Sequence, residues 1–193
     1  MAMAPAPVRY GGVSQALHWL VAVLIVVQFV LASLAEAAQD AGSLLGALTW
    51  FARHKSVGMT ILMLACIRLV WRLAHPPPPL PEAMPAWERM AARISHLLLY
   101  VLLFAMPISG WLMSSAANFP VSWFGLFTWP DLVAAGDARK ELFEAVHEVQ
   151  AKILFALAVL HVAAALKHHI HDRDDVFVRM LPFGRPRGGR GAD

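Results

Sequence analysis

Charge and cysteine are both scarce in this sequence. Only 15% of its 193 residues are charged and 59% are apolar, whereas a soluble domain carries roughly 25% charged residues. We therefore do not expect a water-soluble globule. The single cysteine, Cys66, excludes a disulfide framework, a C-x-x-C zinc site and the C-x-x-C-H attachment of a covalent haem. Any cofactor must be held by other side chains.

Long stretches without acidic or basic residues predict membrane-spanning helices. No such residue occurs from Val13 to Ala35 or from Ile94 to Pro130, and about 20 apolar residues suffice to cross a bilayer. The predicted spans cover residues 14–36, 50–72, 92–115 and 142–168. The sequence therefore predicts an all-α, integral membrane four-helix bundle that forms one domain over residues 1–193.

Three further segments connect and follow these spans. Residues 75–88 are rich in proline, which lacks an N–H and cannot continue a helix, so we expect a stiff loop. Residues 116–140 carry two tryptophans, Trp123 and Trp129, and are expected to form an outer interfacial loop with aromatic anchors. Residues 169–193 are expected to form a polar tail. A signal peptide is an alternative for the first span, but that apolar stretch is longer than the roughly 7 to 15 residues typical of such peptides.

Basic residues indicate the orientation of the bundle. Four spans place both termini on one side, and eleven of the sixteen Lys and Arg residues lie on that side of the predicted topology. Because cytoplasmic loops carry the excess of basic residues, we predict that both termini, the proline-rich loop and the tail are cytoplasmic. The formal net charge of +3 then reflects orientation and contact with membrane lipid, and nucleic acid is not expected as a partner.

Nine histidines are unusual in so apolar a chain, because polar side chains in lipid are costly and usually functional. On the predicted topology, His18 and His161 lie toward the cytoplasmic ends of the first and fourth spans. His54 and His147 lie near the outer ends of the second and fourth. His147 and His161 are 14 residues apart, hence about 21 Å apart along one helix and within roughly 40° of one face. They cannot bind the same metal ion.

Depth in the membrane then pairs His54 with His147 and His18 with His161. Facing side chains on different helices are how bundles hold cofactors in their cores, and without thiolate clusters haem fits better than zinc or an iron–sulfur cluster. With both axial positions filled, the iron has no open site, which favours electron transfer over oxygen chemistry. A lone histidine is more often a hydrogen-bonded or interfacial residue, so the prediction depends on the pairing by depth.

Other polar residues near these pairs have two interpretations each. His96, level with the inner pair, is either an alternative axial ligand or a contact for a haem propionate or a quinone. Arg68 and Arg72 suit haem carboxylates, which guanidinium groups pair bidentately, or only anchor the helix end at the membrane surface. Arg53 and Lys55 flank His54 and either guide a small anion by their local field or contact lipid phosphate or haem propionate.

The remaining histidines are expected at the membrane interface or in solvent. They are His75, His168, His169 and His171.

Seven short motifs are spread over the chain from Tyr10 to about Pro182. They are LHWL at 17–20, RHKSVG at 53–58, RLVWRL at 68–73, SHLLLY at 95–100, MPISGW at 106–111, VHE at 146–148 and LHVAAALKHH at 160–169. In combination they closely resemble the bacterial cytochrome b561 family, whose members are small four-helix dihaem proteins of the membrane.

The resemblance implies two b-type haems ligated by the four histidines of the two pairs, a quinone as an electron partner and a bacterial inner-membrane location. Some four-helix members of the family are superoxide oxidases, which take electrons from superoxide at the outer face and pass them to ubiquinone. Three outer acidic residues, Glu141, Glu144 and Glu148, oppose the guidance of such an anion by Arg53 and Lys55.

The sequence leaves more than one function open. We predict an oxidoreductase or electron-transfer cytochrome that moves electrons between an outer-face donor, such as superoxide, and ubiquinone. A passive electron carrier for a separate periplasmic redox protein is the first alternative. A haem-free, histidine-lined carrier of metal or other ions is the second, and it would show no haem absorbance.

Overall fold

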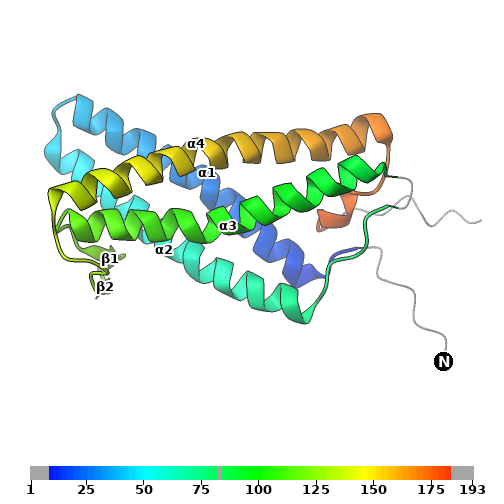
Figure 1. Cartoon of the computed structure of the whole chain (residues 1–193), viewed down its shortest axis with the longest axis horizontal. Coiled ribbons are helices and arrows are strands. Elements are labelled where there is room, and N and C mark those ends of the chain that lie inside the picture. Colours follow the sequence, from blue (N-terminus) through cyan, green and yellow to red (C-terminus); the bar gives the residue numbers. More distant parts are fainter. Residues whose placement is uncertain (1–8, 82–83, 184–193) are drawn as a thin grey trace, which may run out of the picture.

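Four long helices lie side by side in the computed structural model, which describes residues 9–81 and 84–183 (Figure 1). They are α1 (Gly12–Asp40), α2 (Leu44–Ala74), α3 (Ala86–Ala116) and α4 (Asp137–Lys167). α1 packs against α2 and α3 packs against α4, and these two helical pairs meet mainly through α2 and α3. All four helices are long and apolar enough to cross a membrane. The predicted four-helix membrane bundle is confirmed.

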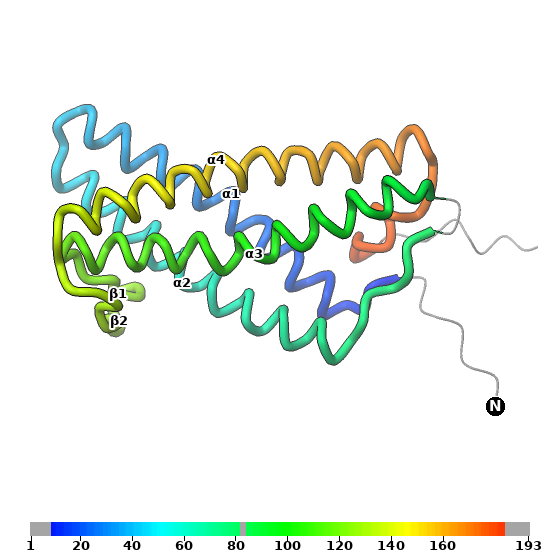
Figure 2. The backbone as a smooth tube through the Cα atoms, viewed as in Figure 1, coloured from blue at the N-terminus to red at the C-terminus, as the bar shows by residue number. Residues whose placement is uncertain are grey.

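The two ends of the bundle differ in what covers them. The described chain begins and ends at the same end, which we call the terminus end (Figure 2). At the opposite end, a β-hairpin of β1 (Val121–Trp123) and β2 (Phe127–Trp129) joins α3 to α4, and we call this the hairpin end. The predicted outer side corresponds to the hairpin end.

The helices are longer than the predicted spans. Each has 29 to 31 residues, which corresponds to about 45 Å, whereas the apolar core of a bilayer is about 30 Å thick. α2 and α3 begin six residues before the predicted spans 50–72 and 92–115, and α4 begins five residues before the predicted span 142–168. Hydropathy marks only the part of a helix that lies in lipid, whereas backbone hydrogen bonding continues through the polar turns beyond it.

The buried core of the bundle is small. Val21, Ile61, Ala65 and Leu103 form a buried cluster between α1, α2 and α3, whereas many long apolar side chains, such as that of Val26, are exposed. Continuous apolar surface of this kind indicates contact with a membrane. The outer surface of the helices is therefore suited to lipid.

The segment 116–140, predicted as an interfacial loop, is more ordered than expected. β1 pairs antiparallel with β2, and the turn between them docks on α2. There the hydroxyl of Ser56 accepts a hydrogen bond from the N–H of Phe124 (3.0 Å), and Trp123 Nε1 donates to Thr60 Oγ1 (3.1 Å). Because Ser56 and Thr60 lie midway along α2, the hairpin reaches back along the bundle, and Trp123 fastens it to a helix. The tryptophan does not act only as an anchor in the interface.

The tail predicted from residue 169 also departs from expectation, because its described part folds back onto the terminus end. α4 continues as a π-helical turn (His168–Asp172), and a short 3-10 helix (Val178–Met180) follows. Arg9 Nη2 donates to the carbonyl of Leu181 (2.6 Å), and Trp19 Nε1 donates to that of Met180 (2.9 Å). The N-terminal segment and α1 thus hold the tail by its backbone carbonyls.

His168 was expected at the interface or in solvent, but its side chain is only 12% exposed. Its Nδ1 lies 2.7 Å from Asp174 Oδ2 and 3.0 Å from Asp172 Oδ2. Lys167 Nζ lies 2.6 Å from Glu88 Oε1, which connects the start of the tail to α3. The polar composition of this segment therefore reflects an ion-pair cluster between α3, α4 and the tail.

The docking of the hairpin on α2 can be tested with Ser56→Ala. This change removes the acceptor of the Phe124 N–H and the donor to the Ser122 carbonyl. We expect a loss of about 1 kcal/mol or more in stability, the usual cost of leaving a partly buried backbone group without its partner. The apparent Tm of the purified protein in detergent measures it.

Thr49→Ala is the matched control, because the Thr49 hydroxyl donates only to the Leu45 carbonyl within its own helix. A Tm for Ser56→Ala no lower than that for Thr49→Ala would contradict the docking.

Candidate cofactor site between two histidine pairs

The structure brings together both histidine pairs that depth in the membrane predicted. The ring centroids of His54 on α2 and His147 on α4 lie 6.4 Å apart. Those of His18 on α1 and His161 on α4 lie 6.3 Å apart. α4 therefore contributes one ring to each pair, and each pair joins two helices across the bundle.

These separations fit one metal ion between the rings of each pair. An imidazole nitrogen lies about 2.0 to 2.1 Å from a bound metal and about 1.2 Å from its own ring centroid, so two rings on opposite sides of one ion have centroids roughly 6.4 Å apart. The two observed distances match this value. Neither pair includes a cysteine or a carboxylate, and this donor set suits the two axial positions of a haem iron.

Hydrogen bonds orient both rings of the hairpin-end pair for binding. His54 Nδ1 lies 3.3 Å from the carbonyl oxygen of Gln28, which can only accept, so this nitrogen carries the proton. His147 Nδ1 lies 2.9 Å from Ser109 Oγ, which itself donates to Gln150 Oε1 (2.8 Å). Ser109 therefore accepts from His147. Both rings are left with Nε2 as a free lone pair, as metal-binding histidines require.

Two glycines make room around this pair. A Cβ atom at Gly110 would lie 3.1 Å from Cε1 of His147, and one at Gly58 would lie 3.0 Å from Nε2 of Gln28. Any larger residue at either position would have to push the neighbouring side chain aside. Within residues 9–81 and 84–183, the buried Oε1 of Gln28 has no hydrogen-bond partner. This oxygen, which lies beside the histidine pair, can therefore accept a hydrogen bond from a further group.

The terminus-end pair has a different neighbour. Arg68 Nη2 lies 3.1 Å from His18 Nδ1, and because a guanidinium only donates, the proton of this ring lies on Nε2. A metal bound at Nε2 requires that proton to leave and Arg68 to turn away. Arg68 and Arg72 both lie over the ring of Tyr100, at 5.3 and 5.1 Å from its centroid. A cofactor carboxylate at this end would compete with His18 for Arg68.

His96, the predicted competitor for the inner site, also contacts His161. Their centroids are 5.3 Å apart, closer than those of His18 and His161. This distance is about 1 Å shorter than two rings on opposite sides of one iron require. The geometry therefore favours His18 as the partner of His161 and leaves His96 as a neighbour of the pair.

The predicted anion-guiding residues lie beside His54. Lys55 Nζ donates to the carbonyl of Pro120 in the hairpin segment (3.2 Å), and the Arg53 guanidinium lies 4.6 Å from the centroid of the Trp50 ring. Two nearby acids already have cationic partners. They are Glu144 with Lys140 (3.8 Å) and Glu148 with Lys152 (2.7 Å). In the part of the chain that the structure describes, neither Arg53 nor Lys55 pairs with a carboxylate.

Three polar residues of this site have roles that the sequence did not reveal. The Gln28 carbonyl and Ser109 bind the rings of the hairpin-end pair, and Gln150 accepts a hydrogen bond from Ser109. A signal existed for Gln28, which stands alone among apolar residues in the first span, and for Ser109, which lies in the MPISGW motif beside Gly110. Gln150 lies within a polar stretch and has no comparable signal.

Comparison with known proteins identifies relatives of this chain. The family described as Prokaryotic cytochrome b561 matches residues 9–183. Cytochrome b561 homolog 2 of Escherichia coli (strain K12) is 40% identical over 190 residues, which cover 94% of this chain and 95% of the relative. Cytochrome b561 homolog 1 of the same organism is 30% identical over 129 residues, 67% of this chain and 73% of the relative.

A third relative, the probable superoxide oxidase CybB of Yersinia pestis, is 28% identical over 179 residues, 92% of this chain and 98% of the relative. The breadth of these matches and the four membrane-spanning helices show that the chain belongs to the prokaryotic cytochrome b561 family and is a multi-pass protein of the bacterial inner membrane, a haem b-binding oxidoreductase or electron-transfer cytochrome.

Proposed function

We propose that this cytochrome holds two b haems and moves single electrons between superoxide at the hairpin end and ubiquinone. One haem lies between His54 and His147 and the other between His18 and His161. Both termini lie in the cytoplasm, because most of the Lys and Arg residues belong to that side.

The observation that carries the proposal is the presence of two separate histidine pairs at two depths along α4. Each pair has the ring separation that one iron needs. The 14 residues between His147 and His161 place the pairs about 21 Å apart along the helix. A single pair would serve one face of the membrane, whereas two pairs in line along one helix suit the passage of electrons through the bilayer.

A bound haem b supplies reversible uptake of one electron without opening a coordination position. The residues of this chain hold and orient the group. Ser109 and the Gln28 carbonyl fix the ring protons on Nδ1 of the hairpin-end histidines. Arg68 and Arg72 at the terminus end provide cations for the carboxylates.

Superoxide as the donor is supported by charge at the hairpin end. Arg53 and Lys55 lie next to His54 without a carboxylate partner among the described residues, and two nearby glutamates are paired with lysines. The name of the Yersinia pestis relative points to the same donor. Two superoxide ions would each lose one electron and become dioxygen, and one ubiquinone would take up two electrons and two protons and become ubiquinol.

Histidine substitutions test the two sites separately. We expect His147→Ala to remove one of two haems, because His54 then has no partner across the metal. His161→Ala and His18→Ala should each remove the other haem. The pyridine haemochrome ratio of haem to protein, measured on purified protein, should fall from about two to about one in each variant.

His171→Ala is the control and should keep both haems, because its side chain is exposed and belongs to neither pair. The inner assignment is wrong if His96→Ala loses a haem while His18→Ala keeps both. A wild-type protein without haem absorbance would instead favour the histidine-lined ion carrier.

Charge substitutions test the donor. We expect Arg53→Gln/Lys55→Gln to slow haem reduction by superoxide by roughly tenfold at low ionic strength, because a local positive field raises the encounter rate of a small anion. The difference should shrink as salt screens the charges. Stopped-flow absorbance with a superoxide source, followed by assay of ubiquinol, measures both steps.

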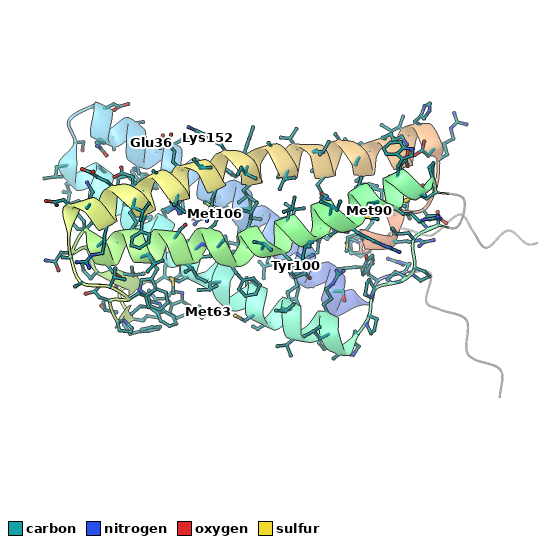
Figure 3. The ribbon with its side chains drawn as sticks, in the orientation of Figure 1. Glu36, Met63, Met90, Tyr100, Met106 and Lys152 are labelled. Carbon is teal, nitrogen blue, oxygen red and sulfur yellow. The ribbon has the colours of Figure 1, made fainter. Side chains whose placement is uncertain are left out.

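Glu148→Gln/Lys152→Gln is the matched control, since it removes two charged side chains near His147 and leaves the net charge unchanged; Figure 3 shows Lys152 midway along α4. It should leave the rate nearly unchanged. If superoxide reduces no haem at any flux, the donor is a separate redox protein and the chain is a passive carrier.

A further inference from the structure

A long cavity lies between α2 and α3 at the terminus end. These helices diverge toward that end (Figure 2), and the space between them has a volume of about 760 Å³. Pro77, Pro78 and Pro79 of the proline-rich loop line it. Tyr100 lies between the two helices (Figure 3), and its ring forms part of the wall.

One face of α3 forms most of this wall. The lining residues Arg89, Arg93, Leu97, Val101 and Phe104 recur every three or four positions, which places them on one side of a helix. From Arg89 to Phe104 this face extends about 22 Å along the axis. The cavity is therefore a groove that follows the helix from its cytoplasmic start toward the middle of the membrane.

One end of the groove is basic and the other end is apolar. Arg72, Arg89 and Arg93 line the end nearest the proline-rich loop, and Tyr10 lies with them. Burial raises the pKa of the Tyr10 hydroxyl above its ordinary value, so it stays a neutral hydrogen-bond donor. The deep end is apolar, where Val101 and Phe104 face the cavity.

We propose that this groove binds one anionic phospholipid, with its phosphate between Arg89 and Arg93 and an acyl chain along Leu97, Val101 and Phe104. Basic pockets between membrane helices bind anionic headgroups in this way, at the side of the membrane where such residues gather. The site lies beside the inner histidine pair, because His96 lines the groove and also contacts His161.

The shape of the groove argues against a small anion as the occupant. Inorganic phosphate would use only the basic end and would leave the apolar wall without a partner. Haem carboxylates are the other candidates for the basic end. They would be expected near Arg68 and Arg72, beside His18, whereas Arg89 and Arg93 lie two and one helical turns from His96 toward the start of α3. Substitution of Arg89 and Arg93 therefore distinguishes lipid binding from the binding of haem carboxylates.

The test is the lipid content of the purified holoprotein. We would purify wild type, Arg89→Gln/Arg93→Gln and Arg139→Gln/Lys140→Gln, the last being a control that removes the same charge at the hairpin end. Each would be loaded in nanodiscs of phosphatidylglycerol or phosphatidylcholine, delipidated in detergent and weighed by native mass spectrometry. Haem per chain would be measured on the same samples.

We expect wild type and control to keep one phosphatidylglycerol per chain and the Arg89/Arg93 variant to keep at least tenfold less, with haem content unchanged in all three. Val101→Trp, which fills the apolar end but retains the arginines, should also lose the lipid.

Four results would overturn the proposal. They are equal retention by the Arg89/Arg93 variant, equal retention of phosphatidylcholine, displacement of the lipid by inorganic phosphate, and loss of haem with the arginines, which would assign the groove to haem carboxylates. Haem content is read separately from lipid content, so failure of the two-haem proposal does not affect this outcome.

Discussion

The structure depends on holding imidazole rings at a fixed separation inside lipid. An unpaired polar group in the membrane is costly, and a pair of rings from different helices is useful only if the helices cannot slide. α4 carries one ring of each pair, so its register against α1 and α2 sets both sites at once. The polar partners of the hairpin-end rings, the Gln28 carbonyl and Ser109, come from α1 and α3. All four helices thus contribute to one geometry.

At both ends of the bundle, the backbone groups of non-helical segments need hydrogen-bond partners. Irregular chain at membrane depth is tolerated only where protein covers it and satisfies its hydrogen bonds. At the hairpin end, Ser56 and Thr60 of α2 bind the turn and Trp123. At the terminus end, Arg9, Gln15 and Trp19 bind the carbonyls of the tail. Each non-helical segment is therefore fixed by polar side chains of a neighbouring segment.

The helices and histidine pairs were predictable because each has a regular signal. Charge-free stretches mark helices, and a spacing of 14 residues along one helix fixes two depths. The hairpin was not predictable, because strands of three residues are too short for an alternating pattern. The folded tail was not predictable either. It is held through backbone carbonyls, which accept hydrogen bonds in every residue type, so its side chains give no signal. Arg68 was placed by a contact with His18, which is far away in sequence, and His168 by the local fold of the tail; hydropathy reports neither.

The two sites share a ligand type but differ in their neighbours. At the hairpin end, both Nδ1 protons go to neutral oxygens and Nε2 is already free, so binding there breaks no hydrogen bond of either histidine. At the terminus end, Arg68 donates to His18, so binding must displace a cation and move a proton from the ring. Arg68 lies over the same tyrosine ring as Arg72, and a carboxylate near both guanidinium groups would compensate for the lost contact. The terminus-end site therefore depends on the charge of its cofactor, whereas the hairpin-end site depends mainly on the shape of the bundle.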